Sequence, residues 1–412
     1  MVTDTRQQRI SKVRLGAARS ALTFVVVLGL GVVVSQSAQA QTLAVLYNFT
    51  GGADGGLPYA GVVRDTAGNL YGTTYEGGSS NYGTVFKVDT SGTETVLYNF
   101  TGGADGRYPS AGLIQDKAGN LYGTTEYGGD FTSGTVFKVD TVGTETVLHS
   151  FGNESGSDGL NPVGGLVLDK AGNLYGTTYD GGSCAVKENR APCTADYGTV
   201  FKVDTSGTET LLHSFGGAPK DGANPSYTSL LMDKTGDLYG VTQDGGPHNG
   251  GVVYKLSTSG KLTVLHSFTG RTKDGYYGHG TPAMDTKGNL YGTTEAGGFY
   301  DAGTVWKVSK KGKETVLHNF AGRGSHGGWP FAGVIMDKTG NLYGVTEGGG
   351  SHNAGVVYKL SAKGKLTLLH SFAVTDGEYP YGGLVRDVKG TLYGTTVKGG
   401  SGSYGTVWKL TP

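Results

Sequence analysis

The sequence predicts an all-β protein, a seven-bladed β-propeller with four strands in each blade. Glycine accounts for 76 of the 412 residues, which would weaken every helix, while 36% hydrophobic and 10% aromatic residues argue against a disordered chain. The types of strand with which the repeats begin and end along the chain favour a closed ring over an open stack. The tripeptide Leu-Tyr-Gly recurs seven times, starting at Leu70, Leu121, Leu174, Leu238, Leu290, Leu342 and Leu392.

The first 40 residues differ from the rest of the chain. Five basic residues precede the apolar run 21–34, and Ala38-Gln39-Ala40 has small residues in the A-x-A arrangement of a cleavage site. The apolar run is shorter than the roughly 20 residues that a membrane-spanning helix needs. We therefore predict that residues 1–40 are a signal peptide removed before Gln41, and that residues 41–412 form a single propeller domain.

The charge of the mature chain excludes some classes of partner. The whole chain has 34 basic and 34 acidic residues; removal of the leader takes away five bases and one acid (Asp4), which leaves a net charge of −4. No basic stripe is present for nucleic acid or an anionic membrane. We expect an exported protein, periplasmic or extracellular and monomeric, that binds no nucleic acid and does not insert into the membrane after cleavage.

Each repeat contains four short segments rich in β-branched and aromatic residues. In the first copy these are residues 61–65, 69–74, 83–88 and 95–100. Asp and Gly separate the first segment from the second and the third from the fourth, as tight turns require. A calcium loop is the less favoured interpretation of these Asp residues, because the ligand pattern D-x-[DN]-x-[DN]-G is absent.

The phase of the repeat predicts how the ring closes. The mature chain begins with a segment of the fourth type, residues 43–49, and ends with one of the third type, residues 405–410. The seventh copy therefore lacks its last strand, and the N-terminal segment supplies one of that type. Closing the circle in this way would hide two strand edges that an open solenoid would leave exposed.

The repeat resembles a known family. Asn-Leu-Tyr-Gly-Thr-Thr, then Gly-Gly, Gly-Thr-Val-Phe-Lys-Val and Glu-Thr-Val-Leu-x-x-Phe are similar to the Gloeo/Verruco ("GloVer") tandem repeat of exported bacterial proteins, over essentially all of residues 43–412. The resemblance implies an extracytoplasmic bacterial protein, but it brings no agreed activity and no catalytic residues to carry over.

One face of the ring should be more variable than the other. Turns after the first and third strands are short and uniform, whereas connections after the second and fourth strands vary in length, as on the binding face of repeat proteins. The largest insertion, in the third blade, carries the only two cysteines. We expect Cys184 and Cys193 to form a disulfide, because two thiols alone are weak support for a metal site.

The nine histidines fall into two groups. Five of them occupy one position of the fourth strand, where Tyr47 and Tyr98 stand in other copies, which indicates packing: His149, His213, His266, His318 and His370. Four break the pattern in the variable connections: His248, His279, His326 and His352. They could form a catalytic or metal centre with a loop carboxylate, or be four solvated loop histidines. We predict no metal site and no cofactor; a divalent metal is expected only if these four converge.

Aromatic residues gather in the same connections and are candidates for ligand binding. Rings beside Asp, Asn and Gly suit stacking on sugar faces or clamping of peptides, although they could instead seal the gaps between blades. The candidates are Tyr276, Tyr277, Trp329, Phe331, Tyr381, Tyr127 and Tyr179.

Three functions are compatible with these observations. The near identity of the seven units favours a non-enzymatic module that binds a carbohydrate or protein partner on the variable face. The alternative is an extracytoplasmic hydrolase or lyase with a histidine and carboxylate, or metal, site over blades four to six, which rests on fold analogy. The third is a structural component of the cell envelope.

Overall fold

The computed structural model describes residues 41–412 except 153–157, 183–196, 228, 271, 273, 323 and 325–326. The fold described below lies within the compact unit that ends at Pro412 and contains all of the described residues. The predicted signal peptide and the predicted Cys184–Cys193 disulfide lie outside the described residues. In the part of the chain that is described, no helix has the length and apolar character needed to cross a bilayer.

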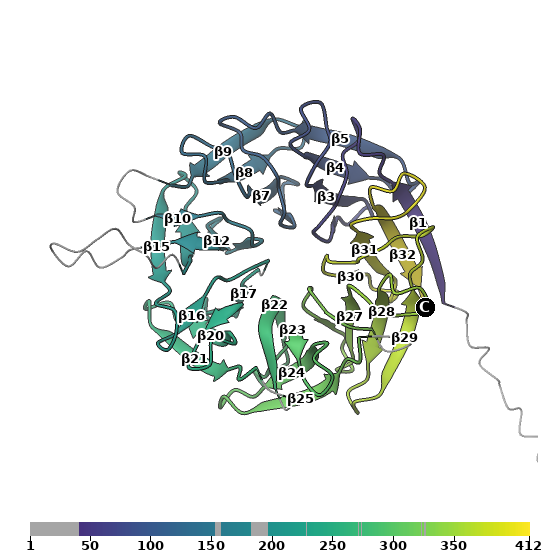
Figure 1. The fold of residues 1–412 in the computed structure, drawn as a ribbon. Helices are drawn as coiled ribbons and strands as arrows, with labels where there is room; N and C mark the ends of the chain where they lie inside the picture. The colour runs from purple at the N-terminus through teal and green to yellow at the C-terminus, as the bar shows by residue number, and fades with distance from the viewer. Residues whose placement is uncertain are drawn as a thin grey trace, which may run out of the picture. The chain divides into compact units, whose positions relative to one another are not determined.

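The described residues form seven four-stranded antiparallel sheets arranged as a ring, which confirms the predicted seven-bladed propeller (Figure 1). Blades one and two contain β2 (Val63–Arg64), β3 (Leu70–Thr74), β4 (Thr84–Val88), β5 (Glu94–Asn99), β6 (Ile114–Gln115), β7 (Leu121–Thr125), β8 (Thr135–Val139) and β9 (Glu145–Ser150). Blades three and four contain β11 (Val167–Leu168), β12 (Leu174–Thr178), β14 (Thr199–Val203), β15 (Glu209–Ser214), β17 (Leu231–Met232), β18 (Leu238–Val241), β20 (Val252–Leu256) and β21 (Leu262–Ser267).

The remaining blades follow the same plan. Blade five contains β22 (Gly275–Met284), β23 (Leu290–Gly297), β24 (Thr304–Val308) and β25 (Glu314–Asn319). Blade six contains β26 (Ile335–Met336), β27 (Leu342–Thr346), β28 (Val356–Leu360) and β29 (Leu366–Ser371), and blade seven contains β30 (Val385–Arg386), β31 (Leu392–Thr396), β32 (Thr406–Thr411) and β1 (Thr42–Asn48). Two small additional sheets pair β10 (Gly159–Leu160) with β13 (Asp180–Gly181) and β16 (Gly222–Ala223) with β19 (Asp244–Gly245).

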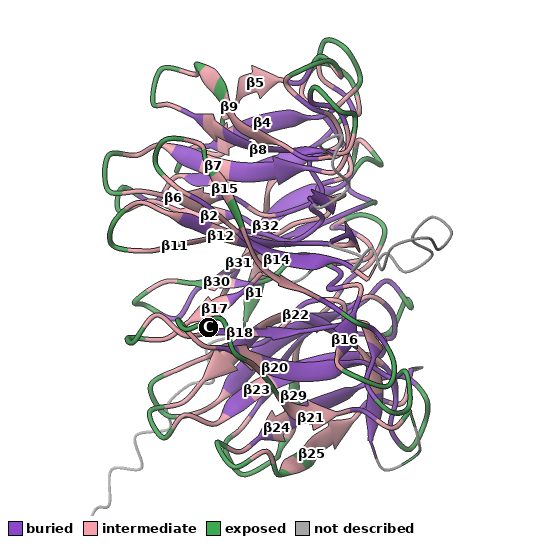
Figure 2. Ribbon diagram, turned by 90° about the vertical axis from the view of Figure 1, so that its left-hand side faces the viewer, coloured by how far each residue is buried: buried purple, intermediate pink, exposed green. Residues whose placement is uncertain are grey.

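The N-terminal strand closes the ring as the repeat phase predicts. β1 pairs antiparallel with β32 and is the outer strand of blade seven, with Thr42 opposite Thr411 and Asn48 opposite Thr406. Figure 2 shows buried residues along the strands and exposed residues in the loops at their two ends.

The innermost strands are shorter than predicted, with blade five as the exception. In blade one, only Val63 and Arg64 pair with the second strand. The preceding residues leave the sheet and form the wall of the central channel. They are held from the neighbouring blade instead: the hydroxyl of Thr73 donates to the carbonyl of Ala111, and that of Thr395 to the carbonyl of Ala60 across the closure.

The hydrophobic core lies in the seams between blades. In each seam a Phe after one outer strand packs on an aromatic residue in the third strand of the next blade. In the closing seam Phe49 meets Phe86, with ring centroids 5.0 Å apart. This packing also explains the Gly of Leu-Tyr-Gly, because a Cβ on Gly72 would lie 2.6 Å from the Phe86 ring. The Gly of each Leu-Tyr-Gly therefore makes room for the aromatic residue of the third strand.

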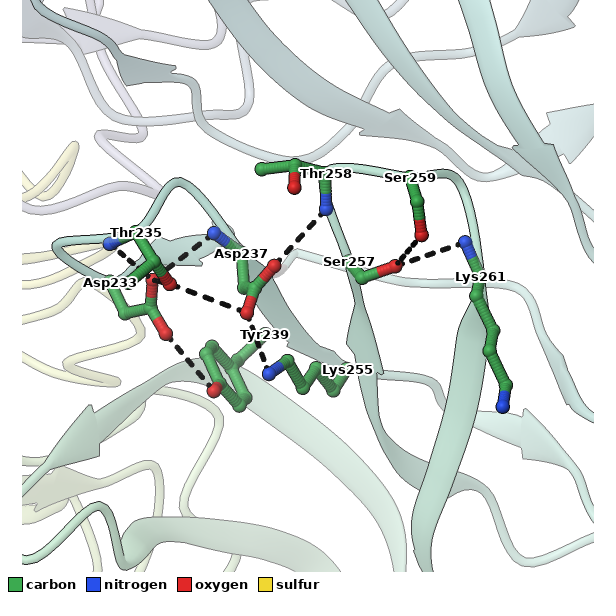
Figure 3. Close-up of polar contacts among 9 residues, drawn as sticks. All are labelled: Asp233, Thr235, Asp237, Tyr239, Lys255, Ser257, Thr258, Ser259 and Lys261. Carbon is green, nitrogen blue, oxygen red and sulfur yellow. Dashed lines mark hydrogen bonds and ion pairs between the residues drawn. The ribbon is translucent and has the colours of Figure 1, made fainter.

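The turn between the first two strands is organised by its Asp. In blade one, Asp65 accepts hydrogen bonds from the backbone N–H groups of Gly68 and Asn69, from the Asn69 side chain and from the Tyr71 hydroxyl. Figure 3 shows the blade-four version, in which Asp237 replaces the Asn and forms a 2.6 Å ion pair with Lys255. One carboxylate thus joins the turn to the second strand.

Replacing this carboxylate should destabilise the fold. We expect Asp65→Ala to lower the free energy of unfolding by about 1–3 kcal/mol, because it leaves several donors of the turn without their acceptor. Urea unfolding of Asp65→Ala and of Thr66→Ala, an exposed neighbour, would measure the difference. Equal midpoints for the two variants would show that the carboxylate does not organise the turn.

Two sets of carboxyl groups have pKa values shifted in opposite directions. Burial, reinforced by a nearby Asp, raises the pKa of four outer-strand residues to about 7: Glu94, Glu145, Glu209 and Glu314. Burial alone would also raise the pKa of the turn Asp residues, but their hydrogen bonds hold it below 3.8, as in Asp65, Asp116, Asp169 and Asp285.

These shifts predict a stability maximum on the acidic side of neutrality. The buried Glu residues bind protons more tightly in the folded state, so their contribution is complete below about pH 4.5 and declines as the pH rises to about 7. The turn Asp residues contribute above about pH 3.8, and this contribution is lost on further acidification. We therefore expect the highest melting temperature near pH 4–5.

A double variant tests the alkaline limb of this profile. Glu94→Leu combined with Glu145→Leu should flatten the fall in melting temperature between about pH 4.5 and 7. Leu stands at the corresponding position in other blades, for example Leu262 and Leu366, so the fold should tolerate it. A double variant with the wild-type slope over this interval would contradict the assignment.

Candidate functional site

The central channel contains a cavity of about 630 Å³ to which all seven blades contribute. Its wall consists of the inner segments, where small residues such as Gly61, Gly333 and Gly382 let the backbones approach closely. No charged residue lines this cavity in the part of the chain that is described. The aromatic residues that line it are Tyr59, Tyr227, Phe331 and Tyr381.

These aromatic residues belong to a continuous series of ring contacts, here called the aromatic arc. It consists of His279, Phe331, Tyr381, Tyr59, Tyr75, Tyr108 and Tyr127, from blades five, six, seven, one and two. Tyr59 and Tyr381 are nearly parallel, at an interplanar angle of 8° and a centroid separation of 5.9 Å. The arc also spans the ring closure between blades seven and one.

The arc forms because two variable connections meet at the same end of the ring. Tyr59, Phe331 and Tyr381 stand directly after the Pro that leads into the first strand, whereas Tyr75 follows the Thr-Thr pair that ends the second strand. The ring centroids of Tyr59 and Tyr75 are 5.1 Å apart. This contact agrees with the expectation that connections after second and fourth strands share one face.

Carboxylates accompany the rings of the arc. Glu347 accepts a 2.8 Å hydrogen bond from the Tyr381 hydroxyl, and Glu295 lies 3.0 Å from Nε2 of His279. Burial raises the pKa of Glu347 and of Glu126. The pKa of Tyr59 is raised mainly by burial, and the negative charges of Glu76 and Glu126 add to that rise. The mouth of the channel therefore combines flat apolar surfaces with hydrogen-bond acceptors.

Of the four histidine candidates, His279 is the one located at this mouth. It is 2% exposed and packs on Phe331, with ring centroids 5.1 Å apart. Nε2 of His279 faces Glu295. His279 also interacts with Asp244: burial raises the pKa of Asp244, and the interaction with His279 offsets part of that rise. His279 is thus a buried partner of carboxylates and not a solvated loop residue.

Neither of the other two histidine candidates that the structure describes joins His279 in a possible metal-binding group. His248 is exposed in a separate groove, and His352 is exposed on blade six with its Nδ1 2.9 Å from the Ser351 hydroxyl. His326 lies outside the described residues. A single centre that uses all four is therefore not visible among the residues that the structure describes, and it stays a hypothesis.

The groove that contains His248 lies at the seam of blades four and five and is here called the 4/5 groove. It encloses about 690 Å³ and includes Tyr276, Tyr277 and Phe299. The Tyr276 hydroxyl donates to Asp301 at 3.2 Å, while the Phe299 ring is 67% exposed. The aromatic candidates thus divide between two surfaces, the channel mouth and this groove.

Apart from Tyr127, which belongs to the aromatic arc, two aromatic candidates lie outside the linings of both cavities. Trp329 packs against the seam cluster that contains Ala302 and Val305, which agrees with the alternative that some rings seal the blades. Tyr179 is half-buried beside Asp180 and Asp244, whose charges add to the effect of burial in raising its pKa. The predicted ligand-binding role of these two residues remains untested.

Tyr227 and three Glu residues of the mouth were not among the candidates predicted from the sequence. The Glu residues are Glu126, Glu295 and Glu347. Tyr227 is 47% exposed, has a positive φ of 48° and lines the channel cavity from blade four. Blade four has one more residue between its Pro and the turn Asp than the other blades that carry this Pro, and that insertion could have identified Tyr227. The Glu residues occupy the variable position directly after the Thr-Thr or Val-Thr pair.

Comparison with known proteins identifies the repeat. A family model described as the Gloeobacter/Verrucomicrobia repeat matches residues 27–226 and 188–408. No curated protein sequence matched the chain.

Solved structures with the same architecture are distant in sequence. The extracellular domain of BT3049 from B. thetaiotaomicron, assigned to a hybrid two component system, superposes with a TM-score of 0.56 at 14% identity, covering 90% of this chain and 41% of that one. The extracellular domain of BT4673 from B. thetaiotaomicron, assigned to a one component system, gives 0.55 at 10% identity, with 90% and 40% covered. The chain spans about two fifths of their length, and at these identities the likeness shows the fold alone.

Proposed function

We propose that this chain, which belongs to the Gloeobacter/Verrucomicrobia repeat family, is an exported binding module that takes a carbohydrate into the mouth of its central channel. The family resemblance and the leader-like N-terminus support export. The extracellular location of the two similar domains supports the same compartment.

The observation that carries this proposal is the aromatic arc with its carboxylates. Sugar rings present apolar C–H faces that stack on aromatic side chains, while their hydroxyl groups donate hydrogen bonds to acceptors. Tyr381 with Glu347, and Tyr59 with nearby Glu126, provide this combination beside the cavity. Anionic ligands suit the part of the arc around Tyr381 and Tyr59 less well, because the charged groups beside these two rings are carboxylates. At the other end of the arc, the guanidinium of Arg107 lies over the rings of Tyr108 and Tyr127.

Substitutions that copy other blades test this assignment without disturbing the fold. Ser110 and Val163 occupy, in blades two and three, the position of Tyr381 and Phe331. The mature chain should bind a member of a glycan array, and Tyr381→Ser and Phe331→Val should each weaken that binding about tenfold, or about 1.4 kcal/mol, through the lost stacking surface.

The matched control is Phe299→Ser in the 4/5 groove. Phe299 is exposed there, so its substitution should leave glycan affinity unchanged. If no glycan binds, or if Phe299→Ser weakens binding as much as Tyr381→Ser, the channel mouth is not a carbohydrate site.

A second candidate function, a hydrolase or lyase, is favoured by one observation. His279 and Glu295 form a pair beside the mouth, with Asp244 close enough to interact, and such groups can transfer protons during bond cleavage. Mass spectrometry of the bound glycan after incubation separates the two functions. An unchanged glycan supports the binding module, and cleavage abolished by His279→Gln would establish the enzyme.

A further inference from the structure

The outer ends of the seams contain a recurring set of polar residues. The Tyr or His of one outer strand faces the Asp of the connection that follows it, as in Tyr47 with Asp54 at 3.0 Å and His370 with Asp376 at 2.9 Å. In four seams the outer strand of the next blade adds a buried Glu. Four of the five fourth-strand histidines, His149, His213, His266 and His370, are therefore not simple packing residues, because each faces an Asp.

The seam between blades four and five brings three such groups closest together. His266 lies in β21, Asp274 precedes β22, and Glu314 begins β25. One potential ligand atom from each side chain lies within 4.8 Å of the other two, and no other group of three His, Cys, Asp or Glu in the described residues meets that criterion. Three separate segments thus point to a common position.

Two of these atoms have no hydrogen bond although they are buried. Oε1 of Glu314 accepts no hydrogen bond, like the corresponding atoms of Glu94, Glu145 and Glu209. Nε2 of His266 forms none either, although it lies 3.4 Å from Oδ2 of Asp274 as an ion pair. The Asp274 side chain is only 10% exposed and is fixed by the backbone N–H groups of Thr269 and Gly275. Buried polar atoms without partners are costly, so a group that satisfies both would stabilise the seam.

Other seams show that this arrangement is not required by the fold. Where Leu262 stands in place of the Glu, the imidazole of His213 lies 3.0 Å from Asp221 and hydrogen-bonds to it directly. In the seam that contains Glu209, His149 likewise keeps a 3.2 Å hydrogen bond to Asp158. Among the described fourth-strand histidines, His266 is the one whose imidazole Nε2 faces both an Asp and a Glu carboxyl group and forms no hydrogen bond.

We propose that His266, Asp274 and Glu314 form a binding site for a first-row divalent transition-metal ion at the seam of blades four and five. One imidazole nitrogen with two carboxylates is a ligand set suited to Zn²⁺, Mn²⁺ or Fe²⁺. Bonds of about 2.0–2.2 Å to a shared ion require only a small closure of the present separations. The ion would neutralise the carboxylates and fasten β21 to β25. This site is independent of the proposed glycan site.

The test is zinc binding to the chelator-treated mature chain, measured by calorimetry and by metal analysis after dialysis. Glu314→Leu introduces the residue that other blades carry at this position, and His266→Tyr copies Tyr47 and Tyr98, so both variants should fold. The wild-type chain should bind one equivalent of Zn²⁺ that both variants lose, and zinc should raise the melting temperature of the wild type alone.

Glu94→Leu is the matched control, because it removes the corresponding Glu from a seam that has Tyr47 in place of a His. This variant should retain the zinc equivalent that Glu314→Leu loses. The proposal is overturned if the wild-type chain binds no zinc at micromolar concentration. It is also overturned if wild type, Glu314→Leu and Glu94→Leu bind equal amounts.

Discussion

A chain that begins at Thr50 should lose its cooperative thermal transition, whereas a chain that begins at Gln41 keeps it. The shorter chain lacks β1 and Phe49, which is fully buried against Phe86 in the closing seam. It also leaves the backbone of β32 without a partner, an exposed edge that promotes association. We expect a loss of more than about 5 kcal/mol, comparable to the whole stability of many domains.

Rescue in trans provides the control for this prediction. A synthetic peptide of residues 41–49 should restore the transition of the chain that begins at Thr50, because it can occupy the vacant outer position of blade seven. A melting temperature within about 2 °C of the longer chain, without peptide, would show that β1 does not close the ring.

Trp306→Ala should cause the largest loss of stability among single substitutions in a seam. Trp306 is fully buried, contacts Phe268 with ring centroids 5.9 Å apart, and covers Gly292. Removal of this ring should lower the free energy of unfolding by about 3–5 kcal/mol, as measured by urea denaturation.

The control is Trp306→Phe. Blades one to three have a Phe at this position, namely Phe86, Phe137 and Phe201. The cost of this substitution should stay below about 1.5 kcal/mol, because an aromatic ring still fills the seam and the buried indole Nε1, which has no hydrogen bond, is removed. Similar costs for the two variants would contradict the role assigned to the aromatic pair.

The repeat phase was enough to predict the blade count and the closing strand, because both depend on the order of strand types along the chain. The extent of the inner strands was less predictable. Residues 59–62 have the composition of a strand, but the channel side offers them no partner, and they bond instead to the Thr of a neighbouring blade, as Ala60 does with Thr395. Pairing across blades has no local pattern in the sequence.

The exchange of Tyr and His in the outer strands was interpreted only as packing. Both residues in fact place a polar atom beside the Asp of the next connection, as Tyr98 and His213 show. The sequence concealed this pairing, because the partners are separated by six to nine residues in connections of different length.

Aromatic residues of the variable connections contact one another, but their division between two surfaces was not predicted. Phe331 and Tyr276 occupy similar connections, yet one lines the channel and the other the 4/5 groove. Phe331 precedes the short inner strand β26, whereas Tyr276 lies within the long inner strand β22. Composition does not reveal this difference.

The central claim is that the channel mouth, and not the 4/5 groove, binds the ligand. Isothermal titration of the glycan selected by the array into two double variants tests it most directly. Tyr59→Ala with Tyr381→Ala removes rings of the arc, and Tyr276→Ala with Tyr277→Ala removes rings of the groove. We predict that the first variant loses binding and the second retains wild-type affinity; the opposite result would contradict the account.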